Sequence, residues 1–90
     1  MNHSDIEAEL RRDGYDVYYG GMGAGIVNPE HAHEWDARVV VIGGEITLSR
    51  GGGSETFRTG DACAVPAGQR HAERAGPQGV AYIVGRRAAA

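Results

Sequence analysis

The chain has 90 residues, of which 41% are hydrophobic, and a formal net charge of −3 at pH 7. This length predicts one domain over residues 1–90 with a single core, and the acidic balance argues against a nucleic-acid partner. All nine cationic residues are arginine, which excludes Schiff-base chemistry on lysine.

The N-terminal segment predicts one short helix over residues 4–13. Ser4 and Glu7 form a capping-box pattern at its start, and Gly14 suits its C-terminal cap. Such a helix would pack on the outside of a domain or against a partner.

Short apolar segments separated by glycine-containing turns fill residues 15–86. The expected strands are 15–19, 26–33, 38–42, 45–50, 54–58, 62–65, 70–74 and 80–85. This pattern predicts an all-β barrel or sandwich. Residues 15–19 alternate like an edge strand, and an edge that needs a cover favours a homodimer. Residues 87–90 are expected to form a disordered tail.

Three of the four histidines lie in two short motifs, His31-Ala32-His33 and a Pro-Ala-Gly-Gln-Arg-His run that ends at His71. Alternate side chains of an extended strand share a face, so His31 and His33 can converge on one ion. His71 follows a Pro-Gly turn at the start of another strand and offers a third imidazole. Three neutral imidazoles favour a divalent transition metal (Fe, Zn, Ni, Cu or Mn) and leave positions open for water or substrate.

The spacing of both motifs resembles that of the cupin superfamily. The first cupin motif, G-x5-H-x-H-x3,4-E-x6-G, runs here from Gly25 through both histidines to Gly44. The second, G-x5-P-x-G-x2-H-x3-N, fits at four positions: Gly60, Pro66, Gly68 and His71. The spacer over residues 45–59 looks like that of small microbial cupins. The resemblance implies a cupin-type (jelly-roll) β-barrel with one short N-terminal helix, and a metal bound by the three histidines.

Two motif positions depart from the family pattern. The motif glutamate, usually the fourth metal ligand, falls on Ala37, or on Arg38 by the longer spacing, and the final asparagine falls on Ala75. Three-histidine cupins include dioxygenases, and some cupins without catalysis have drifted in the same way. The departure therefore affects the expected reaction more than the expected fold.

Two acids are candidates for the missing carboxylate. Period-2 alternation puts Glu73 on the face of His71, where it can ligate the metal or serve as the catalytic base. Glu73 can instead pair with an arginine at the rim of the barrel. Asp36 precedes the vacant position, and a bulge can turn it toward the metal. It is otherwise a solvated turn residue or a partner of Arg38.

Three side chains are candidate contacts for a substrate: Trp35, Arg38 and Tyr82. Trp35 can line the pocket mouth beside the ligands or pack in the core. The hydroxyl of Tyr82 can point inward from the last strand. Arg38, like Arg70, can bind a substrate carboxylate in a bidentate fashion at the rim, or it is an ordinary surface charge.

These features support two hypotheses of function, with a small molecule as the partner in each. One is a metalloenzyme acting on a small polar molecule, dioxygenase-like if the metal is iron and an isomerase or lyase if it is redox-inert. The other is a non-catalytic cupin that binds or senses a small ligand. The single cysteine, Cys63, and the lack of a membrane-length apolar run or signal-peptide pattern predict a cytoplasmic protein without a membrane partner.

Overall fold

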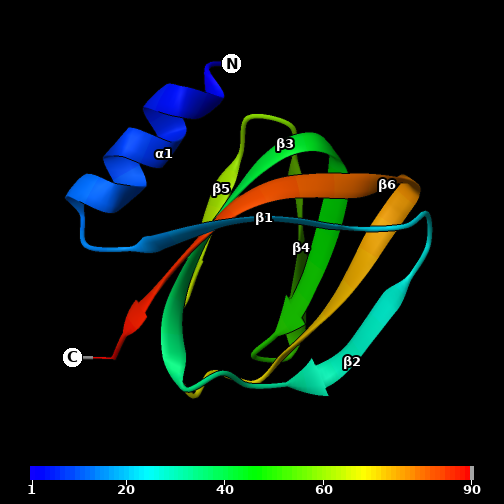
Figure 1. Ribbon diagram of the computed structural model, residues 1–90. Helices are drawn as coiled ribbons and strands as arrows, with labels where there is room; N and C mark the ends of the chain where they lie inside the picture. The colour runs from blue at the N-terminus through cyan, green and yellow to red at the C-terminus, as the bar shows by residue number, and fades with distance from the viewer. Residues whose placement is uncertain (90) are drawn as a thin grey trace.

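The computed structural model describes residues 1–89 and shows strands that curve around one interior, with a helix outside them (Figure 1). The elements in chain order are α1 (His3–Arg12), β1 (Asp16–Met22), β2 (Val27–His31), β3 (Trp35–Arg50), β4 (Gly53–Arg58), β5 (Ala62–Val65) and β6 (His71–Ala88). The expected all-β barrel with one N-terminal helix is therefore confirmed. The described helix is not long and apolar enough to cross a membrane.

Helix α1 starts earlier than the sequence pattern suggests. Its N-cap is Asn2, whose side-chain oxygen accepts a hydrogen bond of 3.1 Å from the backbone N–H of Asp5. The capping box expected at Ser4 and Glu7 is wrong, because Ser4 already lies inside the helix. Gly14 follows the helix with φ +87°, a left-handed conformation that ends the helix without a Cβ penalty.

The sheet is organised around the two longest strands, β3 and β6. The strand order is β1-β6-β3-β4, with β2 also pairing with β6 and β5 with β3. Strand β1 has only β6 as a neighbour among the described residues, as expected for an edge strand. Because β3 and β6 stay paired along most of their length, they carry the chain around the barrel.

Two turns that the sequence predicts at residues 43–44 and 75–79 are instead bends within β3 and β6. The β3–β6 register shifts between Val41 and Gly43 and again between Gly44 and Ile46. Gly44 and Gly79 have φ of +66° and +79°. A glycine with positive φ bends the strand and leaves the ladder on both sides intact.

The predicted C-terminal tail is wrong for residues 87 and 88, which belong to β6. Arg86 pairs with Ala37, Arg87 with Asp36 and Ala88 with Trp35. The β3 strand provides backbone partners that extend the ladder past Val84 to Ala88. Residue 90, also part of the expected tail, lies outside the described residues.

The core follows the alternation of these strands. The most deeply buried apolar side chains are Val41, Ile46 and Ile83. Val41 and Ile46 belong to one core cluster with Leu48 and Val65, and Ile83 is buried outside that cluster. Leu48 and Val65 also form part of the wall of a cavity. The barrel interior is thus filled with side chains over part of its length and hollow over the rest.

Candidate metal centre

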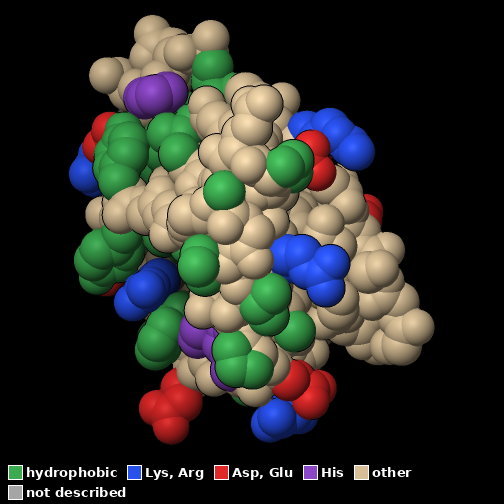
Figure 2. Space-filling view, turned by 90° about the vertical axis from the view of Figure 1, so that its right-hand side faces the viewer, with side chains coloured by type: hydrophobic (Ala, Val, Ile, Leu, Met, Phe, Trp, Pro, Cys, Tyr) green, Lys and Arg blue, Asp and Glu red, His purple; other side chains and the backbone are tan. Residues whose placement is uncertain are grey.

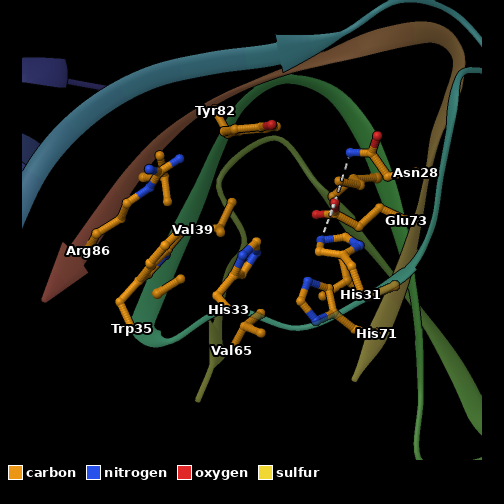
Figure 3. Close-up of a pocket in the computed structure, with 14 residues that line it drawn as sticks. Asn28, His31, His33, Trp35, Val39, Val65, His71, Glu73, Tyr82 and Arg86 are labelled. Carbon is orange, nitrogen blue, oxygen red and sulfur yellow. Dashed lines mark hydrogen bonds and ion pairs between the residues drawn. The ribbon is translucent and has the colours of Figure 1, made fainter. Parts of the chain in front are cut away.

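The three predicted ligands come from three different places in the fold. His31 ends β2, His33 lies in the bend that precedes β3, and His71 begins β6. One ring nitrogen from each lies within 4.8 Å of the others. Figure 3 shows the three rings gathered on one side of the cavity. His33 lies beyond the end of β2, so the irregular bend, as well as strand alternation, brings its ring to 4.9 Å from that of His31.

Backbone carbonyls orient two of the three imidazoles. Nδ1 of His31 lies 2.8 Å from the carbonyl oxygen of Pro29, and Nδ1 of His71 lies 2.9 Å from that of Gln69. Because a carbonyl can only accept, each Nδ1 carries the proton and each Nε2 presents its lone pair. Neutral imidazoles held in this way by a carbonyl are the donors that divalent transition metals prefer. The side chains present therefore fit such an ion.

The third imidazole is held by an aromatic ring. His33 stacks on Trp35, with ring centroids 4.8 Å apart and planes inclined by 14°. Burial, followed by the neighbouring His31 and His71, lowers the pKa of His33 below its usual value. A lower pKa favours the neutral ring, which is the form able to ligate a metal.

Glu73 lies in the same cavity. Its Oε1 accepts a hydrogen bond of 3.1 Å from Nδ2 of Asn28 and lies 3.7 Å from Nε2 of His31 (Figure 3). The register of β2 on β6 explains this, since Asn28 pairs with Glu73. The structure thus brings a carboxylate beside the imidazoles from β6, and its role there stays a prediction.

The other candidate acid does not reach the cavity. Oδ1 of Asp36 accepts a hydrogen bond of 2.8 Å from the backbone N–H of Ala67, in the loop before β6. The alternative in which a bulge turns Asp36 toward the metal is wrong, because the β3–β6 register has no shift there. Ala37, at the motif glutamate position, does line the cavity but contributes only a methyl group.

The candidate substrate contacts divide between two faces of β3. Trp35 and Tyr82 line the cavity. Arg38 does not line the cavity, so its expected place at the cavity rim is wrong. It lines a separate groove with Leu10 of helix α1, because alternation turns it away from the interior. Arg70 is exposed and forms an ion pair of 3.5 Å with Glu30.

The cavity has a volume of about 200 Å³. Its apolar wall comes from β3, β5 and β6, and its polar groups lie around this wall. The lining residues are Asn28, His31, His33, Trp35, Ala37, Val39, Ile46, Leu48, Val65, His71, Glu73, Tyr82, Val84 and Arg86. On the face shown in Figure 2, a histidine side chain is visible near the lower end of the molecule, between hydrophobic side chains.

Sequence reasoning missed two polar residues of this cavity, Asn28 and Arg86. Arg86 shares the parity of Tyr82 along β6, so alternation could have placed it if the strand had been expected to continue. Asn28 had no such signal, because its role depends on pairing with Glu73. Burial, followed by the nearby charge of Glu73, raises the pKa of the Tyr82 hydroxyl above its ordinary value.

Comparisons with known proteins agree with this architecture. A cupin superfamily protein from Desulfitobacterium hafniense DCB-2 has a TM-score of 0.72 at 18% identity, covering 82% of this chain and 67% of its own. A protein of unknown function from Rhizobium leguminosarum has a TM-score of 0.78 at 17% identity, covering 98% and 96%.

The DMSP lyase DddQ from Ruegeria pomeroyi DSS-3 is similar over 83% of this chain, with a TM-score of 0.74 and 26% identity. This chain spans only 39% of that protein. A search of curated proteins found no match. The family model of the cupin domain matches residues 21–84, which include all three histidines. On this match and the barrel that carries it, the chain belongs to the cupin family.

Proposed function

We propose that the protein is a metal-binding small cupin in which His31, His33 and His71 hold one divalent transition metal. The observation that carries the proposal is the approach of three ring nitrogens to within 4.8 Å of one another. The two carbonyl contacts support it, since they leave Nε2 of His31 and His71 free. Such a metal, when bound, would polarise an oxygen of the substrate, or support dioxygen chemistry if it is iron.

We further propose that the protein is an enzyme acting on a small polar molecule. The cavity, about 200 Å³ in volume, holds the carboxylate of Glu73 beside His31, and Tyr82 is part of its lining. Glu73 can accept a proton from a bound molecule. Tyr82 has a raised pKa, so it keeps its proton at neutral pH and can donate a hydrogen bond to a substrate oxygen.

This pairing of a base with a donor favours proton-transfer chemistry, as in a lyase or isomerase, over a dioxygenase-like reaction. The fold shared with the Ruegeria pomeroyi DMSP lyase supports the same class. The alternative is a non-catalytic cupin that binds or senses a small ligand. Ala37 at the position of the usual carboxylate ligand favours that alternative.

Elemental analysis of freshly purified protein tests the metal site. We expect about one transition-metal ion per chain in the wild type and a marked loss in His31→Ala. His3→Ala is the matched control, because His3 lies in helix α1, away from the cavity, with its ring 6.3 Å from that of Tyr19. Equal metal content in wild type and His31→Ala would contradict the proposal.

We also propose a homodimer formed through the edge of the barrel. The side chains of Tyr18 and Tyr19 on β1 are 47% and 54% exposed, and an edge strand leaves backbone groups without partners. Light scattering at micromolar concentrations should give twice the chain mass of 9.5 kDa. A stable monomer over that range would end the idea.

A further inference from the structure

Arg86 lies in a stack of rings at the side of the cavity. Its guanidinium carbon lies 5.0 Å from the ring centroid of Tyr18 and 4.7 Å from that of Trp35. Trp35 in turn stacks on His33 at 4.8 Å. The register explains the arrangement, since Tyr18 pairs with Val84 on β6 and Trp35 lies beyond Ala37, the β3 partner of Arg86. The guanidinium thus makes cation–π contacts with two aromatic rings.

The charge of Arg86 has no acidic partner within residues 1–89. The arginines that form ion pairs in that range are Arg11, Arg58 and Arg70. Asp16 faces Arg86 across the β1–β6 ladder, yet the two side chains form no ion pair. The aromatic rings restrain the side chain through cation–π contacts, which use none of its N–H groups as hydrogen-bond donors. The N–H groups at its edge therefore remain available as donors.

The other polar groups of the cavity lie across from Arg86. Figure 3 shows Arg86 and Trp35 on one side, Glu73 and Asn28 on the other, and His33 between them. Among the residues that line the cavity, Arg86 is the one permanently cationic side chain. A molecule that spans this cavity can therefore place one end at the guanidinium and the other near the imidazoles and Glu73.

We propose that Arg86 binds a carboxylate of the molecule that occupies this cavity, so that the substrate is a small carboxylic acid. The inference deepens the proposed function and rests on it, because the occupant is taken to be the substrate. A guanidinium and a carboxylate are both planar and pair through two parallel hydrogen bonds. The two rings hold Arg86 in place beforehand, which reduces the ordering cost that makes most surface ion pairs weak.

A carboxylate fits this site better than a phosphate does. A phosphate carries more charge and is usually bound by several donors or cations together. Here one arginine stands among the lining residues, with Glu73 in the same cavity and a net charge of −3 on the chain. A group with a single negative charge is therefore the better complement.

Ligand titrations of the full chain test this inference. The chain has one tryptophan, so its fluorescence reports from Trp35 alone, against which Arg86 packs. The probes are acetate and succinate, their uncharged analogues acetamide and succinamide, and inorganic phosphate. We expect a saturable response to a carboxylate and a weaker response to its amide. Arg86→Gln should weaken carboxylate binding by about 10- to 100-fold, the usual range for a lost hydrogen bond to a charged group.

Arg87→Gln is the matched control. It removes the same charge from the neighbouring residue, whose side chain turns outward, contacting the Tyr15 ring and donating to the Asp13 carbonyl. This variant should bind carboxylates like the wild type. Equal binding by wild type and Arg86→Gln would overturn the inference. So would equal binding of amide and carboxylate, tighter binding of phosphate, or no saturable response to either carboxylate.

Measuring the metal content of every sample separates the test of the Arg86 contact from the test of the metal site. Weaker carboxylate binding by Arg86→Gln at unchanged metal content supports the anion contact by itself. A wild type that binds no metal but binds succinate through Arg86 would count against the metal proposal and leave the anion site standing. Normal metal content with no effect of Arg86→Gln on carboxylate binding would support the metal proposal and overturn the anion site.

Discussion

The three histidines and Glu73 are each oriented by a neighbouring group. The carbonyls of Pro29 and Gln69 set the ring orientations of two ligands, and Trp35 supports the third. Asn28 holds the carboxylate of Glu73. Such outer contacts orient the groups that would bind metal and substrate, so their loss should be measurable as reduced affinity.

Glu73→Gln tests the role of the cavity carboxylate. We expect metal affinity or activity to fall about 10- to 100-fold, because the change removes a negative charge beside His31 at nearly constant volume. Metal affinity by competition with a chelator gives the measurement. Glu30→Gln is the control, since Glu30 pairs with Arg70 on the surface. If both variants behave like the wild type, Glu73 has no part in the site.

Cys63 is expected to react slowly with thiol reagents. Burial raises the pKa of its thiol above the usual value of about 8.5, and only the thiolate is nucleophilic. Alkylation of the folded protein at pH 8 should be about tenfold or more slower than that of the urea-unfolded chain. Equal rates would show that the thiol is accessible.

The raised pKa of the Cys63 thiol also makes the free energy of unfolding depend on pH. Above the pKa of the unfolded thiol, the unfolded chain loses its proton while the folded chain keeps it. Stability should therefore fall as pH rises from about 8.5 toward the higher folded pKa. Cys63→Ala should remove this part of the alkaline dependence, as followed by urea unfolding at several pH values.

At the scale of elements, the barrel depends on long strands that bend without ending. Strands β3 and β6 each continue through a segment that reads as a turn, and the bends occur where glycine adopts positive φ. Gly44 also has no room for a side chain, because an added Cβ would collide with the carbonyl oxygen of Gly79 on β6. The close approach of these two backbones thus requires glycine.

Gly44→Ala and Gly52→Ala form a matched pair that distinguishes the cost of backbone strain from the cost of a steric clash at Cβ. Both glycines have positive φ, but a Cβ at Gly52, in the β3–β4 hairpin turn, would meet no atom within 4 Å. We expect Gly52→Ala to cost about 1–2 kcal/mol from backbone strain alone. Gly44→Ala should cost clearly more or prevent folding. Equal midpoints of urea unfolding for the two variants would contradict this account.

The whole molecule is small, so a bound ion should contribute a visible share of its stability. Metal at a hundredfold excess over its dissociation constant adds about 2.7 kcal/mol, which corresponds to several degrees in melting temperature for a domain of this size. A chelator should lower the melting temperature of the wild type at pH 7.5. His31→Ala, lacking a ligand, should show little change. An unchanged wild-type melting curve would exclude a stabilising metal.

Acid should remove this stabilisation. The imidazoles bind metal only when neutral, and the ordinary pKa of histidine is about 6.5. The contribution of the metal should be present above that pH and should fade as pH falls below it, because protons then compete for the same nitrogens. Melting curves with and without chelator should converge at acid pH. A constant difference between them would argue against histidine ligands.

Residue types and spacing determined the family, the barrel and the three histidines. Those features depend on local rules, since alternation, glycine punctuation and the HxH and PxGxxH motifs can all be read along the chain. The parity of Glu73 with His71 also predicted a carboxylate near the rings. The boundaries of β3 and β6 could not be read in this way, because glycine indicates a turn or a bend equally well until a paired strand selects one.

Only the tertiary structure decided which charged groups share the cavity. Asp36 and Arg38 lie beside the ligand motif in sequence, yet one binds the Ala67 backbone and the other lies in the groove with helix α1. Arg86 is far from the motif in sequence and lies at the cavity because β3 extends β6 to Ala88. Neighbours along a strand point to opposite faces, whereas residues distant in sequence meet across paired strands. The chain by itself therefore specified the three histidines, and strand pairing specified the groups that surround them.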